Sequence, residues 1–403
     1  MKRRILLVDG EGQSLRELRA ELAALADEWE IAEAANGANA LASIAASPVQ
    51  AVVADMQLTD MTGEQLLGQV LQQFPHTHRV VLADLGDLES LLRCVGGVHQ
   101  FVIKPCTAAR LQVVLQRAFE LDVWLPNHTV RRLVGHVPRL PSLADSYNAA
   151  VRLVERNDAT PESVGELMAR DPAMAAKMLQ LANSAAYGEP TDDFDLVEAV
   201  REIGLANTRA CLLLAHSWSG FAEVEHAGFA MKSLSTHANE VSALAAWLAR
   251  SEGASDKLIG LARTAGLLHD VGKLALAANL PGQFLRSVTL ARERGCAAFE
   301  AEQEIFGATH GEVGGCLLGF WGLPMAVVEA VALHHHPACF LSRQFSPLTA
   351  VHVANALCRA DSGDHFRASV EREYLGVLGL ADKIPSWWET GRVELQRLRN
   401  RHV

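Results

Sequence analysis

The hydrophobic pattern of the chain changes near residue 125, and this change constrains the fold more than any other feature. Before it, four short apolar runs alternate with helical segments such as "GEQLLGQVLQQF"; the runs are "RILLVD", "AVVADM", "RVVLAD" and "QFVIKP". Strands that alternate with helices predict a parallel sheet covered on both faces. After it, helical spacing continues with almost no strand pattern. We therefore predict a doubly wound α/β domain followed by an all-helical domain.

A proline-rich segment separates the two parts. The stretch "PNHTVRRLVGHVPRLPSL" contains three prolines and follows the helical segment "TAARLQVVLQRAFELDVWL". A chain of 403 residues is also too long for one ordinary core. The sequence predicts a first domain over residues 1–123, a linker over 124–137 and a helical domain over 138–403.

The charge pattern and the cysteines limit which classes of partner and which cellular compartment fit the sequence. The net charge is −11, and residues 1–125 hold 10 basic against 16 acidic side chains, without a basic tail or stripe. This balance disfavours direct binding of nucleic acid or of an anionic membrane. The longest uncharged stretch, between Glu312 and Glu329, is rich in glycine and broken by Pro324, so we expect no membrane span. Seven cysteines without a CxxC motif, and a start without a signal-peptide apolar region, predict a cytoplasmic location.

Charged residues follow the apolar runs of the first domain. Asp9 and Glu11 follow the first run, Asp55 lies in the second, and Lys104 follows the last. In parallel sheets, ligands bind at the carboxyl ends of the strands. Carboxylates there can hold Mg²⁺, and one can accept a phosphoryl group that a lysine neutralises. Taken singly, each residue is equally well explained as a solvated charge on a loop.

Three motifs of this region resemble the receiver domain of two-component response regulators, over roughly the first 120 residues. They are "ILLVD", "VVADMQLTDMTG" and "FVIKP". The resemblance implies a five-stranded parallel sheet, Mg²⁺ as cofactor and a sensor histidine kinase as partner. It also implies residue roles: Asp55 is the phosphoacceptor, Lys104 senses the phosphate and precedes Pro105 in a cis peptide, and Phe101 is the aromatic switch residue.

Two positions depart from the receiver pattern. Where the family has a pair of acids after the first strand, this chain has Asp9 and Gly10, so one direct Mg²⁺ ligand is missing unless Glu11 substitutes for it. Where the family has Ser or Thr at the end of the fourth strand, this chain has Ala83, which lacks the hydroxyl that binds the phosphoryl group. A docking domain that works without phosphorylation is therefore the competing interpretation.

The second domain carries a set of metal-ligating residues. An apolar segment runs into "HDVGK", which contains His269, Asp270 and Lys273, and further histidines are His237, His310 and the triplet His334, His335 and His336. Imidazoles and a carboxylate from several helices suit Fe, Mn or Zn. Such a metal would polarise a phosphoryl oxygen, and Lys273 could contact a phosphate. Each histidine alone is more simply explained as a hydrogen-bonded core residue.

This set resembles the HD superfamily of metal-dependent phosphohydrolases, in which two branches compete. The HD-GYP branch hydrolyses cyclic di-GMP, whereas the HDOD branch shares the helical scaffold and is regarded as an interaction domain. Helical segments ahead of the histidines match the HDOD branch, including an Asp-Pro pair and an Asn-Ser pair (Asp171, Pro172, Asn183 and Ser184). This resemblance covers residues from about 137 to at least 360.

Two absences argue against the phosphodiesterase branch. No Gly-Tyr-Pro signature follows the histidines in "HHHPACFLSRQF", and Asn355 stands where that branch has its last metal-binding Asp. An amide is a poorer ligand than a carboxylate. Asp361 lies about one and a half turns further on and should point elsewhere. A single metal held by His237, His269, Asp270 and His310 remains compatible with the sequence.

We therefore predict a two-component response regulator whose receiver controls a non-catalytic HDOD domain. The expected partner is a downstream signalling protein, and the expected homodimer forms through the last helix and strand of the receiver. The alternatives are a metal-dependent phosphodiesterase acting on cyclic di-GMP or another nucleotide, and a non-catalytic nucleotide sensor in which Lys273 and the histidines bind phosphate.

Overall fold

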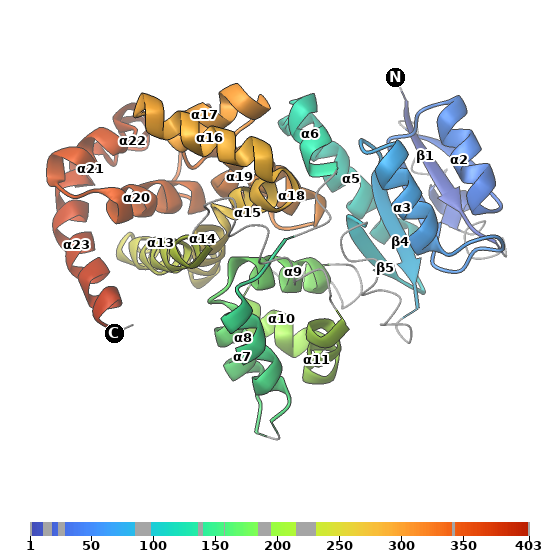
Figure 1. The fold of residues 1–403 in the computed structure, drawn as a ribbon, viewed down its shortest axis with the longest axis horizontal. Coiled ribbons are helices and arrows are strands. Elements are labelled where there is room, and N and C mark those ends of the chain that lie inside the picture. Colours follow the sequence, from blue (N-terminus) through green and yellow to red (C-terminus); the bar gives the residue numbers. More distant parts are fainter. Residues whose placement is uncertain are drawn as a thin grey trace.

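The structure, a computed structural model, describes residues 2–10, 18–22, 29–84, 98–135, 140–156, 158–183, 195–214, 231–340 and 343–401. Its first part is an α/β domain with a five-stranded parallel sheet of order β2-β1-β3-β4-β5 (Figure 1). The strands are β1 (Arg3–Val8), β2 (Trp29–Ala34), β3 (Ala51–Asp55), β4 (His78–Ala83) and β5 (Gln100–Ile103). The doubly wound α/β prediction is confirmed.

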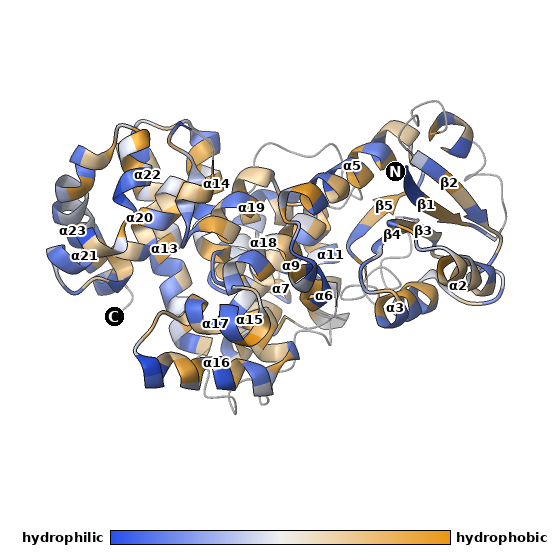
Figure 2. Ribbon diagram, turned by 90° about the horizontal axis from the view of Figure 1, so that it is seen from above, coloured by the Kyte–Doolittle hydropathy of each residue, from blue (hydrophilic) through white to orange (hydrophobic). Residues whose placement is uncertain are grey.

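Helices cover the two faces of this sheet, and each face has its own apolar layer. Helices α2 (Gly37–Ala46) and α3 (Gly63–Gln73) pack on one face, and α5 (Ala108–Trp124) packs on the other. Strands β3 and β4 are buried throughout, as expected for a sheet covered on both sides, and Figure 2 shows much of the inner part of the sheet in the hydrophobic colour. Strand β2 lies at an edge and buries only Trp29 and Ala34, so it shows no continuous apolar run in the sequence.

The rest of the described chain is helical, as predicted. Its longer N-terminal helices are α7 (Ala144–Val154), α8 (Pro161–Met168), α9 (Pro172–Asn183), α10 (Leu196–Ile203) and α11 (Leu205–Leu214). Then follow α13 (Met231–Ser251), α14 (Asp256–Leu268), α15 (Val271–Asn279), α16 (Pro281–Arg294), α17 (Ala298–Phe306), α18 (His310–Phe320) and α19 (Met325–Leu333). The chain ends with α20 (Pro347–Arg359), α21 (Gly363–Ser369), α22 (Arg372–Val377) and α23 (Ile384–Arg401).

The Asp-Pro pair noted in the sequence has a structural role. The carboxylate of Asp171 accepts hydrogen bonds from the backbone N–H groups of Ala173 and Met174 at 2.9 and 3.1 Å, which caps the start of α9. Its other oxygen accepts from Leu143 N at 2.7 Å, just ahead of α7. One buried carboxylate therefore ties two helix starts together. Of the Asn-Ser pair, Ser184 lies outside the described residues.

The segment predicted as a linker contains a folded helix. Helix α6 (His128–Gly135) buries Val130 and Val134 and packs against α18. Gly135 allows this approach, because a Cβ there would lie 2.5 Å from the carbonyl oxygen of Pro75 in the first domain. The prolines indicated a hinge, but much of the segment is a packed helix. Its two buried valines are one helical turn apart, which is too short a pattern to stand out in the sequence. The boundaries at 123 and 138 stay predictions.

The two domains meet along one edge of the sheet. The ring of Phe320, the last residue of α18, lies 4.7 Å (centroid to centroid) from His78, the first residue of β4, and 4.5 Å from His99, which precedes β5. Gln180 of α9 donates its amide N–H to the backbone carbonyls of Val98 and His99 at 3.3 and 3.4 Å. The apolar layer on one face of the sheet continues through α5 into the helical domain.

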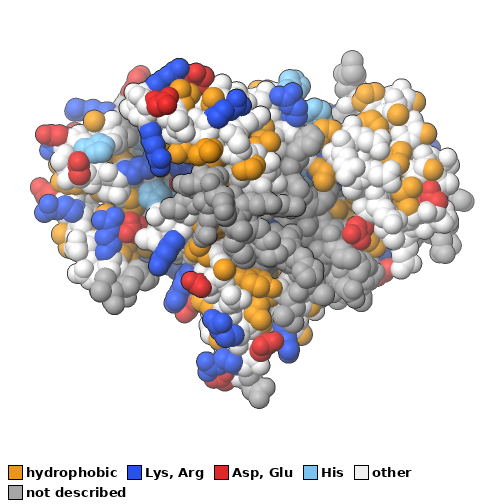
Figure 3. All heavy atoms as spheres, in the orientation of Figure 1, with side chains coloured by type: hydrophobic (Ala, Val, Ile, Leu, Met, Phe, Trp, Pro, Cys, Tyr) orange, Lys and Arg blue, Asp and Glu red, His pale blue; other side chains and the backbone are white. Residues whose placement is uncertain are grey.

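The surface shows no concentration of positive charge on the face drawn in Figure 3. There, basic and acidic side chains lie interspersed over the helical part. None of the helices among the described residues combines the length and hydropathy needed to cross a bilayer.

Candidate functional site

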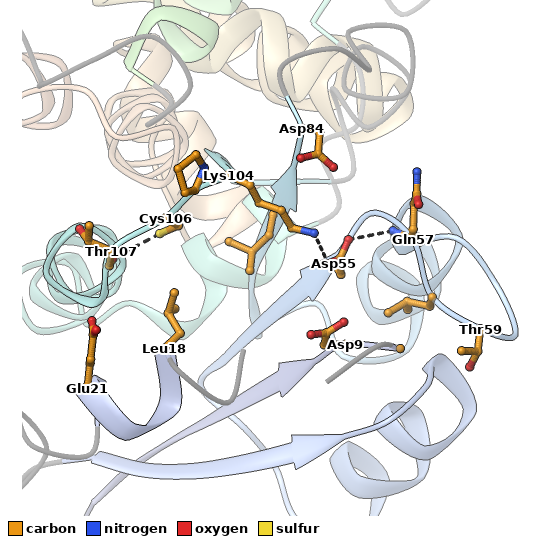
Figure 4. A pocket seen from close by; sticks show the side chains of 14 residues that line it. Asp9, Leu18, Glu21, Asp55, Gln57, Thr59, Asp84, Lys104, Cys106 and Thr107 are labelled. Carbon is orange, nitrogen blue, oxygen red and sulfur yellow. Dashed lines mark hydrogen bonds and ion pairs between the residues drawn. The ribbon is translucent and has the colours of Figure 1, made fainter. Parts of the chain in front are cut away.

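The first candidate site lies at the carboxyl ends of β1, β3 and β4, as the sequence predicts for a parallel sheet (Figure 4). Asp55 ends β3 and is 6% exposed. One of its carboxylate oxygens bonds to the ammonium of Lys104, and the other accepts from Gln57 N at 3.0 Å. The peptide between Lys104 and Pro105 is cis, as the resemblance implies. The predicted phosphoacceptor and its lysine therefore lie in direct contact.

Asp9 lines the same pocket, and the two carboxylates suffice for a magnesium site. Mg²⁺ is usually held by one or two carboxylates together with water and substrate phosphates. Asp9 and Asp55 fit that donor set. Glu11 lies outside the described residues. The absence of a side chain at Gly10 has a steric explanation, because a Cβ there would lie 3.0 Å from the side chain of Thr59 in the loop that follows β3.

The pocket contains two carboxylates that the sequence analysis missed, Asp84 and Glu21. Asp84 directly follows β4 and lines the pocket beside Lys104 (Figure 4). The sequence contained a signal for Asp84, since it ends the third apolar run as Asp9 ends the first. Ala83 is 1% exposed, and its carbonyl accepts Lys104 N at 2.9 Å. Phe101, the predicted switch residue, is buried in the core at 1% exposure.

The second candidate site is a buried cluster at helix ends of the second domain. His269 and Asp270 form the turn between α14 and α15, His310 begins α18, and His334 follows α19. These four side chains are at most 2% exposed. The sequence elements that carry them are up to 65 residues apart, counted from His269 to His334, and the fold brings them together.

The hydrogen bonds of three imidazoles fix their tautomers. His269 Nδ1 lies 2.7 Å from the carbonyl of Gly266, and His334 Nδ1 lies 2.8 Å from that of Val331. A carbonyl oxygen can only accept, so each Nδ1 carries the proton and each Nε2 presents a lone pair. His310 Nδ1 donates in the same way to Glu302 at 2.6 Å. Histidines that bind metals are oriented in this way, by a partner on the other ring nitrogen.

The lone pairs converge on one carboxylate. Asp270 Oδ1 lies 3.1 Å from His310 Nε2 and 3.9 Å from His334 Nε2, and Asp270 Oδ2 lies 3.5 Å from His269 Nε2. His269 Nε2, His334 Nε2 and Asp270 Oδ1 are buried without a hydrogen-bond partner. Unpaired buried polar atoms cost roughly 1–3 kcal/mol each, so three of them facing one another are the donor arrangement expected of a ligand site. This donor set fits a divalent metal such as Fe, Mn or Zn.

The electrostatics keep most of the cluster in its metal-binding protonation state. His310 is the exception, because burial alone would lower its pKa but the carboxylate of Glu302 raises it above the usual value. Burial lowers the pKa of His269 to about 3 and also lowers the pKa values of His334 and His335, so these rings stay neutral. Burial alone would raise the pKa of Asp270, but the ammonium of Lys273 and the neighbouring histidines hold it well below its usual value. Lys273 Nζ lies 2.7 Å from Asp270 Oδ2, so the side chain predicted to contact a phosphate forms an ion pair with Asp270.

The remaining predicted ligands lie at the rim of the cluster. His335 Nε2 is 3.2 Å from His310 Nε2, and its donor atom lies within 4.8 Å of those of His310 and His334. His237, on α13, lies similarly close to His269 and Asp270, but its Nε2 is 3.0 Å from the Asn355 side-chain oxygen. Asp361 is exposed and bonds to His365, so it does not reach the cluster.

Two residues of this site were not predicted from the sequence. Glu302, on α17, is 2% exposed and accepts from both the backbone N–H and the ring of His310. His352, on α20, donates from Nδ1 to the carbonyl of His334 at 2.8 Å and accepts from Glu371 N at 2.9 Å. Nothing in the spacing around these residues indicated that they hold the ligands in place.

Replacing Glu302 by Gln is expected to weaken metal binding by about 10- to 100-fold, because the carboxylate orients His310 and makes it more basic. The measurement is a Mn²⁺ titration of the full chain in excess Mg²⁺, which occupies the carboxylates of the first domain. Glu304→Gln is the matched control, since Glu304 lies on the same helix but is exposed and pairs with Arg294. Equal affinities for the two variants would contradict the role assigned to Glu302.

Comparison with known proteins assigns both domains. The family model of the response regulator receiver domain matches residues 5–116, and that of the HDOD domain matches residues 140–337. The hydrogenase transcriptional regulatory protein HoxA of Cupriavidus necator is 26% identical over 178 residues, which are 41% of this chain and 36% of that protein. The chain spans less than two fifths of the length of the curated relatives that it matches first.

Two solved structures resemble the chain over more than half of its length. The MmoQ response regulator of Methylococcus capsulatus is 24% identical, with a TM-score of 0.46, and the match covers 62% of this chain and 97% of MmoQ. A virulence factor of Campylobacter jejuni is 19% identical, with a TM-score of 0.50, over 65% of this chain and 94% of that one. The second likeness supports the fold. By the two family models and the sheet and helices described above, the chain combines an N-terminal response regulator receiver domain with an HDOD domain of the HD superfamily, an architecture that fits a response regulator.

Proposed function

We propose that Asp55 accepts a phosphoryl group from a sensor histidine kinase in the cytoplasm and that the receiver thereby controls the HDOD domain. A carboxylate oxygen of Asp55 attacks phosphorus, and the P–N bond of the kinase phosphohistidine breaks as the new P–O bond forms. The contact between Lys104 and Asp55 supports this role, because the ammonium would neutralise the added charge. Mg²⁺ held by Asp9 and Asp55 would supply further charge neutralisation.

Incubation with acetyl phosphate and Mg²⁺ is expected to add the mass of one phosphoryl group to the wild-type chain and none to Asp55→Asn. Intact-protein mass spectrometry measures the modification, and peptide mapping locates it. Asp364→Asn, which changes an exposed carboxylate of the HDOD domain, is the control and should behave as wild type. A chain that stays unmodified would favour a docking domain that works without phosphorylation.

The proposed output is a metal-loaded signalling domain that acts on a protein partner. The observation that carries this proposal is the convergence of three unpartnered buried atoms, on His269, Asp270 and His334, beside the ring of His310. These residues would hold one Fe, Mn or Zn ion, with His335 and His237 at the rim. A metal bound there would act as a Lewis acid toward a phosphoryl oxygen.

Several observations favour signalling over hydrolysis. The ligands are almost fully buried, Lys273 is bonded to Asp270 instead of being free for a phosphate, and Asn355 replaces a carboxylate and bonds to His237. We expect no turnover of cyclic di-GMP by the metal-loaded chain. The assay compares the wild type with His269→Ala and Asp270→Ala. Turnover that both substitutions abolish would instead identify a metal-dependent phosphodiesterase.

A further inference from the structure

Helix α18 connects the receiver to the metal cluster. Its first residue, His310, places Nε2 at 3.1 Å from Asp270 Oδ1, and its last residue, Phe320, packs against His78 and His99 of the receiver. The 11 residues between and including them span about 16 Å as a single helix. Figure 1 shows α18 between the receiver's α5 and the helices α15 and α19.

The receiver end of α18 meets β5, the strand that leads to Lys104. A Cβ at Gly322, just after α18, would lie 3.3 Å from the side chain of Gln100, the first residue of β5. The last residue of β5 is followed by Lys104, which bonds to Asp55. A movement of Lys104 on modification of Asp55 would therefore act on a four-residue strand whose other end contacts α18.

The cluster end of α18 is packed backbone to backbone against the other segments that carry ligands. A Cβ at Gly272, two residues after Asp270, would overlap the carbonyl oxygen of His310. A Cβ at Gly311 would lie 2.8 Å from the carbonyl oxygen of Ala332, two residues before His334. Such interfaces have no compressible side chains, so a displaced α18 moves its neighbours or separates from them.

We propose that α18 transmits the state of the receiver to the metal cluster, because the same helix packs Phe320 on His78 and His99 of the receiver at one end and positions His310 against Asp270 at the other. This inference rests on the proposed metal binding. The preformed spacing of His310 and Asp270 requires α18 to be held at both ends. By linkage, metal binding at the cluster must shift the conformational equilibrium of the receiver by the same coupling free energy.

The test is the Mn²⁺ affinity of the full chain with the receiver contact removed. In excess Mg²⁺, Phe320→Ala is expected to raise the Mn²⁺ dissociation constant at least about fivefold, the lower end of typical couplings between sites. Phe366→Ala is the matched control, since Phe366 is equally buried but stacks on Trp388 at the far end of the molecule from the receiver (Figure 1). Phe320→Leu keeps the position apolar and serves if the alanine variant does not fold.

Hydrogen exchange supplies the reciprocal measurement on the same samples. Mn²⁺ is expected to slow amide exchange in the β5 peptide of the wild type and of Phe366→Ala, but not of Phe320→Ala. Equal Mn²⁺ affinities in all variants, with no effect of Mn²⁺ on β5, would overturn the coupling and leave the metal site intact. A wild type that binds no Mn²⁺ would overturn the proposed metal site, and the coupling with it.

Discussion

Full-length protein with His269→Ala or Asp270→Ala is expected to lose at least about 100-fold in affinity for Mn²⁺ or Zn²⁺, more than the removal of an outer-shell partner costs. The reason is geometric, because His269 Nε2 and Asp270 Oδ1 are two of the three unpartnered atoms that face one another in the buried cluster. Without His269 the metal loses one imidazole ligand, and without Asp270 the remaining imidazoles no longer surround a carboxylate. The measurement is a calorimetric titration of each variant with Mn²⁺ or Zn²⁺, in buffer with excess Mg²⁺.

His365→Ala is the control for this loss. His365 is half exposed and bonds to Asp361 on the surface, so its removal changes the number of imidazoles without touching the cluster. It should bind metal with wild-type affinity. If all three alanine variants bound metal equally well, the ion would lie elsewhere and the cluster would be a hydrogen-bonded core without a ligand.

Replacement of Gly272 by Ala is expected to destabilise the chain by about 3 kcal/mol or more, at the upper end of what overpacking costs. The added Cβ would overlap the carbonyl oxygen of His310 and lie 2.8 Å from Gly314 N, and both neighbours are backbone atoms that cannot rotate away. Helices α15 and α18 must then separate. Thermal unfolding should show a melting temperature lower by about 6–12 °C.

Gly260→Ala tests whether the effect is specific to the helix contact. Gly260 lies inside α14, and a Cβ there would meet nothing within 4 Å. Helix propensity then predicts a gain of up to about 1 kcal/mol. Unchanged melting of Gly272→Ala would mean that α15 and α18 can part without cost, which would contradict their role in fixing Asp270 against His310.

Much of the architecture was predictable from the sequence because it depends on local patterns. The four apolar runs correspond to β1, β3, β4 and β5, and the order of strands and helices placed Asp9, Asp55 and Lys104 at one sheet edge. The adjacent His269 and Asp270 marked the second site for a similar reason, since a polar pair directly after an apolar helix must be satisfied by specific partners.

What could not be predicted depends on contacts between distant segments. Glu302 and His352 act on ligands that are neighbours only in the fold, and the proton positions on His269 and His334 follow from carbonyls at helix ends. Edge strand β2 buries too few residues to show a pattern. Helix α6 is short, and its burial depends on a surface supplied by α18.

The structure also gives a physical setting for the two positions that depart from the receiver pattern, Gly10 and Ala83. Gly10 leaves room for the loop after β3, and Asp84 adds a negative charge beside Lys104 where Ala83 offers no hydroxyl. This further carboxylate in the pocket should favour the cation and oppose the phosphoryl group. The receiver therefore retains the phosphoacceptor and its lysine but has a different charge balance around them.

The most direct test of the account is the metal content of the untagged, full-length protein purified without oxygen, measured by elemental mass spectrometry beside His269→Ala. The account predicts stoichiometric Fe, Mn or Zn in the wild type and little in the variant. A wild type that carries no more of these metals than His269→Ala, and takes none up when they are supplied, would contradict it.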